Sequence, residues 1–183
     1  MTYELDIAGL KRSLPICKAT DTLYIGAFVM FGDVEITCHA AAELLKKAPE
    51  FDYIIAPEAK AIPLAYEMSR QSGVQYLLAR KKAKAYMSGI FEVRVQSITT
   101  AGEQVLVIDT ADAEKMRGKR ILIVDDVIST GESLRAMEEL VRQAGGITVA
   151  KMAVLAEGDA INRDDITVLA PLPLFQPDGS IME

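Results

Sequence analysis

Two adjacent acids, Asp125 and Asp126, stand at the end of an apolar run and are followed at once by a small polar turn. The apolar residues 121–124 predict a strand, and ligands of open parallel sheets bind beyond the carboxyl ends of the strands. The hydroxyl side chains and glycine of 129–133 lead into a helical pattern, which predicts an anion site at a helix N-terminus. A ligand that suits both ends carries hydroxyls or Mg2+ at one end and a phosphate at the other, as a phosphorylated sugar does.

Three alternatives account for only part of the pattern in residues 121–133. A plain polar strand end with Ser129 or Thr130 as a helix N-cap accounts for each residue alone, but not for the thirteen-residue arrangement together. A Walker B aspartate needs an upstream G-x-x-x-x-G-K-[ST] loop, and the sequence contains none. A receiver-type acid pair would follow the first strand, whereas this pair begins at position 125.

The segment ILIVDDVISTGES, residues 121–133, resembles the phosphoribosyl-pyrophosphate (PRPP) signature of the type I phosphoribosyltransferases. The signature ends in Thr-Gly-Gly-Thr, and here those positions hold Thr130, Gly131, Glu132 and Ser133. Glu132 replaces the second glycine, but its backbone N–H can still serve a phosphate. The resemblance implies that Ser129 to Ser133 anchor the 5′-phosphate. It also implies that Asp125 and Asp126 hold the ribose hydroxyls and meet metal indirectly, through PRPP-bound Mg2+.

A second segment, PEAKAIP at 57–63, follows a predicted strand at 53–56. By itself it is an ordinary strand-to-helix turn. It also resembles the Pro-Glu-Ala-Arg-Gly segment of the purine members of the family, with Lys60 in place of arginine and Ala61 in place of glycine. The resemblance implies that Glu58, Ala59 and Lys60 form part of a pyrophosphate site. Lys60 would offer a single ammonium charge there, where arginine would offer a planar guanidinium.

A third segment, RKKAK at 80–84, concentrates basic residues in an acidic chain. Such a run is most often a solvated face. It also resembles the Arg-Lys-x-x-Lys of adenine and xanthine phosphoribosyltransferases, which implies pyrophosphate contacts for Arg80, Lys81 and Lys84. Residues 85–102 are expected to be the mobile loop that closes over the reacting centre. The family's usual loop acid is absent, because 100–102 read Thr-Ala-Gly.

The resemblance implies that base specificity lies in the N-terminal and C-terminal parts of the chain, which form a hood in the family. Two residues there are candidates for binding the purine. Phe28 could stack on a purine, although a buried core phenylalanine is equally compatible with its surroundings. Glu157 lies in VLAEGD, which resembles the base-contacting Glu-Lys of the xanthine members, but Gly158 replaces the lysine. A carboxylate alone suits a hydrogen-bond donor such as an exocyclic amine, so the segment favours aminopurines.

Composition excludes several classes of protein. The chain has 183 residues and a formal net charge of −6, so a nucleic-acid partner is not expected. The N-terminus lacks the apolar core of a signal peptide, and no apolar run approaches the ~18 residues of a membrane span. Cys17 and Cys38 are too few for a disulfide framework or a zinc site. We expect a reduced, cytoplasmic protein.

The remaining pattern predicts an α/β fold. Short Val- and Ile-rich runs at 53–56, 74–79, 103–109, 120–124 and 147–156 alternate with helical patterns at 34–48, 61–72 and 131–144. This alternation predicts a parallel twisted sheet with helices on both faces. The resemblance implies that this sheet is the type I phosphoribosyltransferase fold. We expect one domain, 1–183, with a core at about 34–156. The segments 1–33 and 157–183 are expected to form a small hood.

The resemblance implies a purine phosphoribosyltransferase of purine salvage, which converts PRPP and a purine base to a nucleoside monophosphate and pyrophosphate. Adenine is the favoured base, and Mg2+ is the expected cofactor. A homodimer is expected from the resemblance alone. Two alternatives stay open: a xanthine or guanine phosphoribosyltransferase, and a non-catalytic PRPP-binding regulatory protein.

Overall fold

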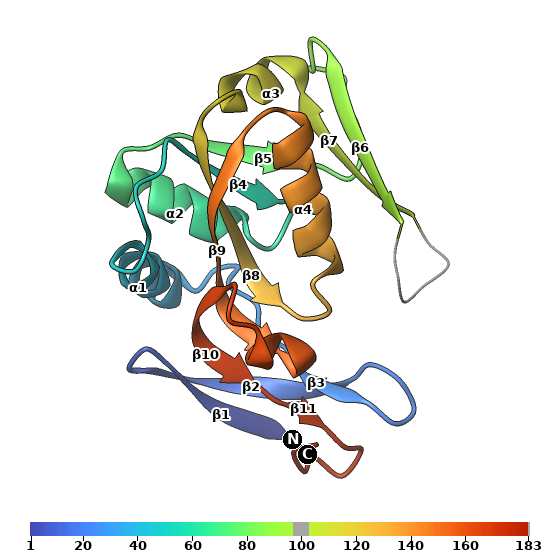
Figure 1. The fold of residues 1–183 in the computed structure, drawn as a ribbon. Coiled ribbons are helices and arrows are strands. Elements are labelled where there is room, and N and C mark those ends of the chain that lie inside the picture. The colour runs from blue at the N-terminus through green and yellow to red at the C-terminus, as the bar shows by residue number, and fades with distance from the viewer. Residues whose placement is uncertain (97–102, 183) are drawn as a thin grey trace.

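A five-stranded parallel sheet forms the centre of the protein in the computed structural model, which describes residues 1–96 and 103–182 (Figure 1). Its strands, in spatial order, are β10 (Thr167–Leu172), β9 (Ile147–Glu157), β8 (Arg120–Ile128), β4 (Tyr53–Pro57) and β5 (Tyr76–Ala79). All four strand pairs are parallel. The predicted α/β fold class is confirmed.

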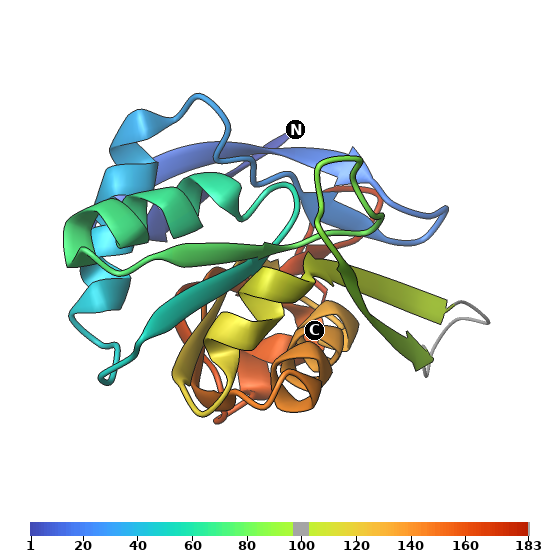
Figure 2. The same ribbon diagram turned by 90° about the horizontal axis from the view of Figure 1, so that it is seen from above.

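Helices cover both faces of this sheet. One face packs against α1 (Val34–Leu45) and α2 (Ile62–Ser72), and the other against α3 (Thr110–Met116) and α4 (Glu132–Gln143). Figure 2 shows the two layers from above. Strand β8 is apolar on both sides, because Leu122 contributes to the first core and Ile123 to the second. A strand buried on both faces is expected in a parallel sheet.

The helix boundaries follow from local chemistry. Asp33 caps α1, since its carboxylate accepts a hydrogen bond from the Ile36 backbone N–H at 3.1 Å. Pro63 lies in the first turn of α2, where its missing N–H costs nothing, and Gly73 ends that helix with φ +75°. Helix α4 buries Leu134, Met137, Leu140 and Val141 on one stripe.

An antiparallel hairpin, β6 (Ile90–Gln96) and β7 (Glu103–Asp109), forms a separate two-stranded sheet. An isolated antiparallel bridge between Arg80 and Val107 joins it to the residue after β5. Residues 103–109 do form the predicted strand, but their expected place in the parallel sheet is wrong. Part of the expected mobile loop, 90–96, is also a strand. Val93 and Leu106 pack into the same core as α4, and this burial explains why the segment pairs as a hairpin. Residues 97–102, with the position of the missing loop acid, lie outside the described residues.

The two ends of the chain meet in a second sheet below the core (Figure 1). Strands β1 (Thr2–Ile7), β2 (Leu10–Lys18), β3 (Tyr24–Gly26) and β11 (Leu174–Phe175) form it in that order. The rings of Tyr3 and Phe175 pack edge to face, with their centroids 5.1 Å apart. The expected hood boundary is wrong in one respect, because β10 belongs to the core sheet beside β9. The single-domain organisation stays a prediction.

Three features of the described residues bear on the expectations from composition. Within 1–96 and 103–182, no helix is long and apolar enough to cross a membrane. Cys17 and Cys38 are both free thiols. The single histidine, His39, bonds the Ala8 carbonyl through Nε2 at 2.7 Å and so joins α1 to the β1–β2 turn. This contact gives His39 a structural role.

Candidate active site

A cavity of about 800 Å3 opens at the carboxyl ends of β4 and β8. These strands are where the chain order reverses: from β4 the chain moves outward to β5, whereas β8 leads to β9 on the opposite side. Such a switch point leaves a crevice, because the connections on its two sides run in opposite directions. Thirteen residues line the cavity: Pro57, Glu58, Ala59, Lys60, Lys81, Gln104, Val105, Leu106, Asp125, Asp126, Val127, Ser129 and Ser133. Most of the residues predicted from the three sequence segments are therefore brought together.

The unequal pairing of β8 positions its two acids. Its ladder with β4 ends at Ile123, whereas its ladder with β9 continues to Ile128. The strand thus runs beyond the predicted end at 124, and the acids lie within it. From Val124 onward, β9 holds one edge of the strand and the cavity lies on the other side. Asp125 and Asp126 therefore sit within a paired strand and line the cavity.

The two carboxylates differ in their surroundings. Asp126 is only 6% exposed, and its Oδ2 has no hydrogen-bond partner within the described part of the chain. Asp125 accepts a hydrogen bond from the Asp126 backbone N–H at 2.9 Å. Burial, and then the charge of Asp126, raise the pKa of Asp125 well above its ordinary value, and Lys60 partly opposes the shift. A buried carboxylate oxygen without a partner is expected where a ligand supplies the missing contact.

This electrostatic arrangement predicts how stability depends on pH. Because the native state holds the Asp125 proton more tightly than the unfolded chain does, this group costs stability as pH rises from ~4 through the raised native pKa. Asp125→Asn should therefore melt at a higher temperature than the wild type at pH 8, by about 2–4 °C for each kcal/mol relieved. The gain should vanish near pH 4. Calorimetry over this range checks the result, and an equal gain at both pH values would contradict it.

The turn after β8 is built to receive an anion. Gly131 has φ +77°, a left-handed conformation that favours glycine, and α4 begins at the next residue. The unpaired N–H groups of the first turn and the helix dipole point toward this turn. Ser129 and Thr130 are exposed, and a cavity of about 40 Å3 is lined by residues of 125–134. Phosphate binding by residues 129–133 stays a prediction.

The two basic segments are joined through Glu58. Its carboxylate accepts hydrogen bonds from the Lys81 backbone N–H and from Arg80 Nη1, each at 3.0 Å. These contacts, with the Lys81 bond first, hold the pKa of Glu58 below its usual value. Lys60 and Lys81 are exposed and line the cavity. Glu58 thus orders the segment from which cations face the site.

Arg80 and Lys84 lie farther from the cavity than predicted. Arg80 is turned to Glu58 and to the Tyr86 ring, whose centroid is 5.7 Å from the guanidinium carbon. With Tyr86 it lines a separate cavity of about 350 Å3. Lys84 is exposed and acts on Glu58 through its charge. Their contacts with pyrophosphate stay predictions.

The two predicted purine-binding residues do not line the main cavity. Phe28 is 5% exposed and belongs to the core beneath α1. Glu157 ends β9, and burial raises its pKa while the charge of Lys60 lowers it. The charge of Lys60 also opposes the rise in the pKa of Asp125. Purine binding by Phe28 and Glu157 stays a prediction.

Sequence reasoning missed two contributions to the site. Gln104, Val105 and Leu106 of β7 form one wall of the cavity. No local motif marks them, since their position depends on the β6–β7 hairpin packing against α4. Arg163 was also missed, and its guanidinium lies beside Gly131 of the phosphate loop.

Known proteins are similar to this chain in sequence and in fold. The model of the phosphoribosyl transferase domain matches residues 34–169. The adenine phosphoribosyltransferase of Thermosipho africanus is 30% identical over 88% of this chain and 93% of its own. A hypoxanthine/guanine phosphoribosyltransferase of Methanohalobium evestigatum is 33% identical over 61% of this chain and 55% of its own.

Solved structures agree on the fold. The adenine phosphoribosyltransferase of Thermoanaerobacter pseudethanolicus superposes with a TM-score of 0.66, at 23% identity, over 78% of this chain and 84% of that one. The Trypanosoma brucei enzyme superposes with a TM-score of 0.62, at 15% identity, over 86% of this chain and 76% of that one. The family match covers four strands of the core sheet, the start of β10, the acid pair and the loop 129–133. The resemblance predicted from residues 121–133 is confirmed: the chain belongs to the phosphoribosyl transferase domain family, whose enzymes transfer a pentosyl group.

Proposed function

We propose that this protein is an adenine phosphoribosyltransferase, which transfers 5-phosphoribose from PRPP to adenine in purine salvage and releases AMP and pyrophosphate. The observation that carries the proposal is the cavity of about 800 Å3 that joins the acid pair, the phosphate loop and the lysines Lys60 and Lys81. Curated relatives named adenine phosphoribosyltransferase support the choice of base.

The acid pair and the phosphate loop have complementary roles in this reaction. As pyrophosphate leaves, positive charge develops on the ribose, and Asp125 and Asp126 are placed to stabilise it and to accept hydrogen bonds from the ribose hydroxyls. The backbone and hydroxyl groups of 129–133 anchor the 5′-phosphate. Binding energy at that remote group orients the anomeric carbon toward the purine.

The leaving group requires positive charge on the opposite wall. Lys60 and Lys81 supply it directly from the cavity lining, and Arg80 and Lys84 lie on the same segment as Lys81. Glu58 binds the Lys81 backbone and Arg80, so it holds this segment in place before the ligand arrives. Prearranged cations stabilise developing negative charge without reorganising during the reaction.

Mg2+ fits this donor set as an ion that arrives with PRPP. The described residues contain no group of three His, Cys, Asp or Glu side chains that could hold a metal by themselves. The buried, unpartnered Oδ2 of Asp126 offers one oxygen to the hydrated ion or to the hydroxyls that bind it, and Asp125 lies beside it. Bound Mg2+ would neutralise the pyrophosphate charge.

The choice of base rests on the carboxyl end of β9. Glu157 is followed by Gly158, so no adjacent lysine is present to pair with an oxopurine carbonyl. A carboxylate accepts a hydrogen bond from the exocyclic amine of adenine. The hypoxanthine/guanine relative supports an oxopurine as the second candidate substrate.

We further propose a cytoplasmic homodimer that requires Mg2+. Free Cys17 and Cys38 fit a reducing compartment. Val29, Phe31 and Val34 expose apolar side chains within one short segment, as a contact between copies would require. Light scattering should give twice the chain mass of 19.9 kDa, and a value for a single chain would contradict the dimer.

A pyrophosphate-release assay tests the proposed activity. Mg2+ and PRPP are supplied with adenine, guanine, hypoxanthine or xanthine in turn. We expect release with adenine and at least about tenfold lower kcat/KM with the oxopurines, a difference of about 1.4 kcal/mol. Faster release with guanine or hypoxanthine would establish the second candidate. Binding of PRPP without release from any base would identify a non-catalytic regulatory protein.

A further inference from the structure

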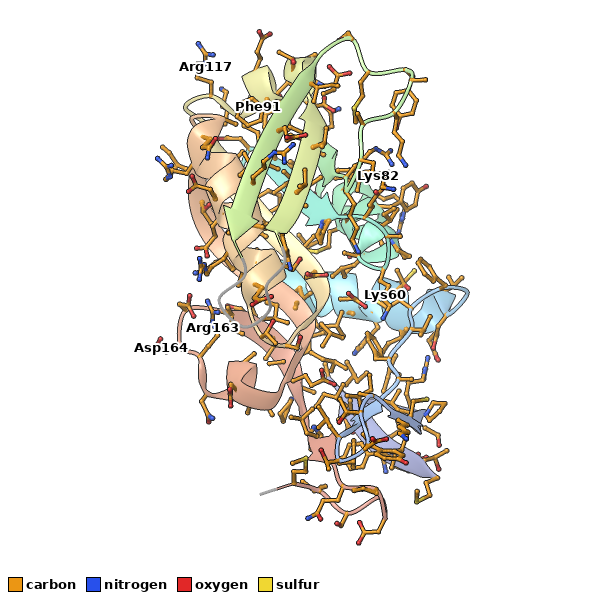
Figure 3. The ribbon with its side chains drawn as sticks, turned by 90° about the vertical axis from the view of Figure 1, so that its right-hand side faces the viewer. Lys60, Lys82, Phe91, Arg117, Arg163 and Asp164 are labelled. Atoms are coloured by element: carbon orange, nitrogen blue, oxygen red, sulfur yellow. The ribbon has the colours of Figure 1, made fainter. Side chains whose placement is uncertain are left out.

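Arg163 lies against the phosphate loop. It follows η1 (Gly158–Asn162), a short 3-10 helix after β9. A Cβ atom added to Gly131 would lie 2.5 Å from Arg163 Nη1, so the guanidinium rests almost against the loop backbone. Figure 3 shows Arg163 beside the lower end of α4, with Lys60 on the other side of the view.

Two of the three guanidinium nitrogens are already used. Nε and Nη2 donate to the two carboxylate oxygens of Asp165 at 2.8 and 2.7 Å, which fixes the plane of the group. Nη1 has no acceptor within the described part of the chain. The bidentate pair therefore leaves the free N–H groups of Arg163 on the side of Gly131.

A second ion pair holds this arrangement in place. Lys151 of β9 donates to Asp165 at 2.5 Å and to Glu138 of α4 at 2.9 Å. Arg163 first, and Lys151 second, hold the pKa of Asp165 well below its usual value, so the carboxylate stays charged. The Lys151 side chain is only 14% exposed, which limits its freedom. The Arg163 guanidinium is thus connected, through Asp165 and Lys151, to both β9 and α4.

We propose that Arg163 binds the 5′-phosphate held by residues 129–133. This inference rests on the proposed function, which places that phosphate in the loop. The turn itself offers neutral N–H and hydroxyl donors from residues 129–133. Arginine adds a permanent positive charge for a dianionic phosphate at every physiological pH. Arg163 donates to the phosphate through Nη1, the nitrogen nearest Gly131.

Calorimetric titration with ribose 5-phosphate and, separately, with pyrophosphate tests this role. Arg163→Gln should raise the Kd for ribose 5-phosphate about tenfold, equivalent to about 1.4 kcal/mol. Arg163→Lys should raise the Kd for ribose 5-phosphate less than Arg163→Gln does, because lysine keeps the positive charge but lacks the planar guanidinium. The Kd for pyrophosphate should not change. Arg142→Gln is the matched control, since Arg142 makes a similar bidentate pair with Glu139 on the exposed part of α4.

The outcomes separate this inference from the proposed function. Unchanged ribose 5-phosphate affinity in Arg163→Gln overturns the role of Arg163, as does an equal loss of pyrophosphate affinity, which would indicate a general disturbance of the fold. Wild-type protein that binds neither ligand overturns it too. If the wild type binds ribose 5-phosphate with the predicted Arg163 dependence but releases no pyrophosphate from any base, only the transferase proposal fails.

Discussion

Replacing Asp125 and Asp126 together by asparagine is expected to lower kcat/KM for PRPP by at least about 1000-fold. Asparagine keeps the shape of the side chain but removes the negative charge that stabilises a cationic ribose. The loss should exceed that of a binding defect alone, because charge develops in the transition state and is weaker in bound PRPP. Initial rates of pyrophosphate release at varied PRPP concentration measure the effect.

The control for this double variant removes the same charge elsewhere. Asp21→Asn with Asp178→Asn changes two exposed acids far along the chain from the acid pair, and it should keep the wild-type rate. Thermal melting should show that the Asp125/Asp126 variant remains folded. A double variant with an unchanged rate would show that the acid pair has no part in the reaction.

Gly131→Ala is expected to raise the Kd for PRPP about 30-fold, equivalent to about 2 kcal/mol. Alanine at φ +77° is strained, and its Cβ would approach Arg163 Nη1 to 2.5 Å. The loop can relieve both problems only by rotating its backbone, which withdraws the N–H groups from the phosphate. Titration with PRPP in the presence of Mg2+ measures this loss.

Gly118→Ala separates backbone strain from loss of the phosphate site. Gly118 has φ +68°, but a Cβ there meets nothing within 4 Å. Both variants should lose stability, by about 2–4 °C in Tm for each kcal/mol. Only Gly131→Ala should lose PRPP affinity. Equal affinities in the two variants would show that the conformation of Gly131 does not matter for binding.

The parts of the fold that were predicted correctly are those whose signals are local. Helix α4 repeats Leu134, Met137 and Leu140 at helical spacing, and the turn before it contains its glycine. The pairing of β6 with β7 could not be predicted in this way, because the burial of Val93 and Leu106 depends on distant α4. The position of β10 beside β9 likewise depends on contacts between segments.

The candidate site likewise contains residues with a local sequence signal and residues that only contacts between distant segments bring together. Asp125, Asp126 and the loop 129–133 form one contiguous signal, so their common position was predictable. The ordering of Lys81 by Glu58 joins residues 23 positions apart, and no spacing rule marks that pair. Arg163 was not predicted because neither its neighbours in sequence nor its type distinguish it from an exposed arginine. Its proposed role depends on η1, which directs the chain back so that Arg163 lies beside Gly131.

One irregularity in the sheet has a consequence for how this protein can change in evolution. Ile121 pairs with Thr148, but Leu122 pairs with Ala150, so Val149 is an extra residue in β9. Everything after it, including Glu157 and Arg163, is displaced by one position relative to the acid pair. Substitutions that preserve apolar character can accumulate in these strands, whereas the loss of this single residue would move Glu157 and Arg163 together. Descendants of this sequence should therefore tolerate changes of residue here far better than changes of length.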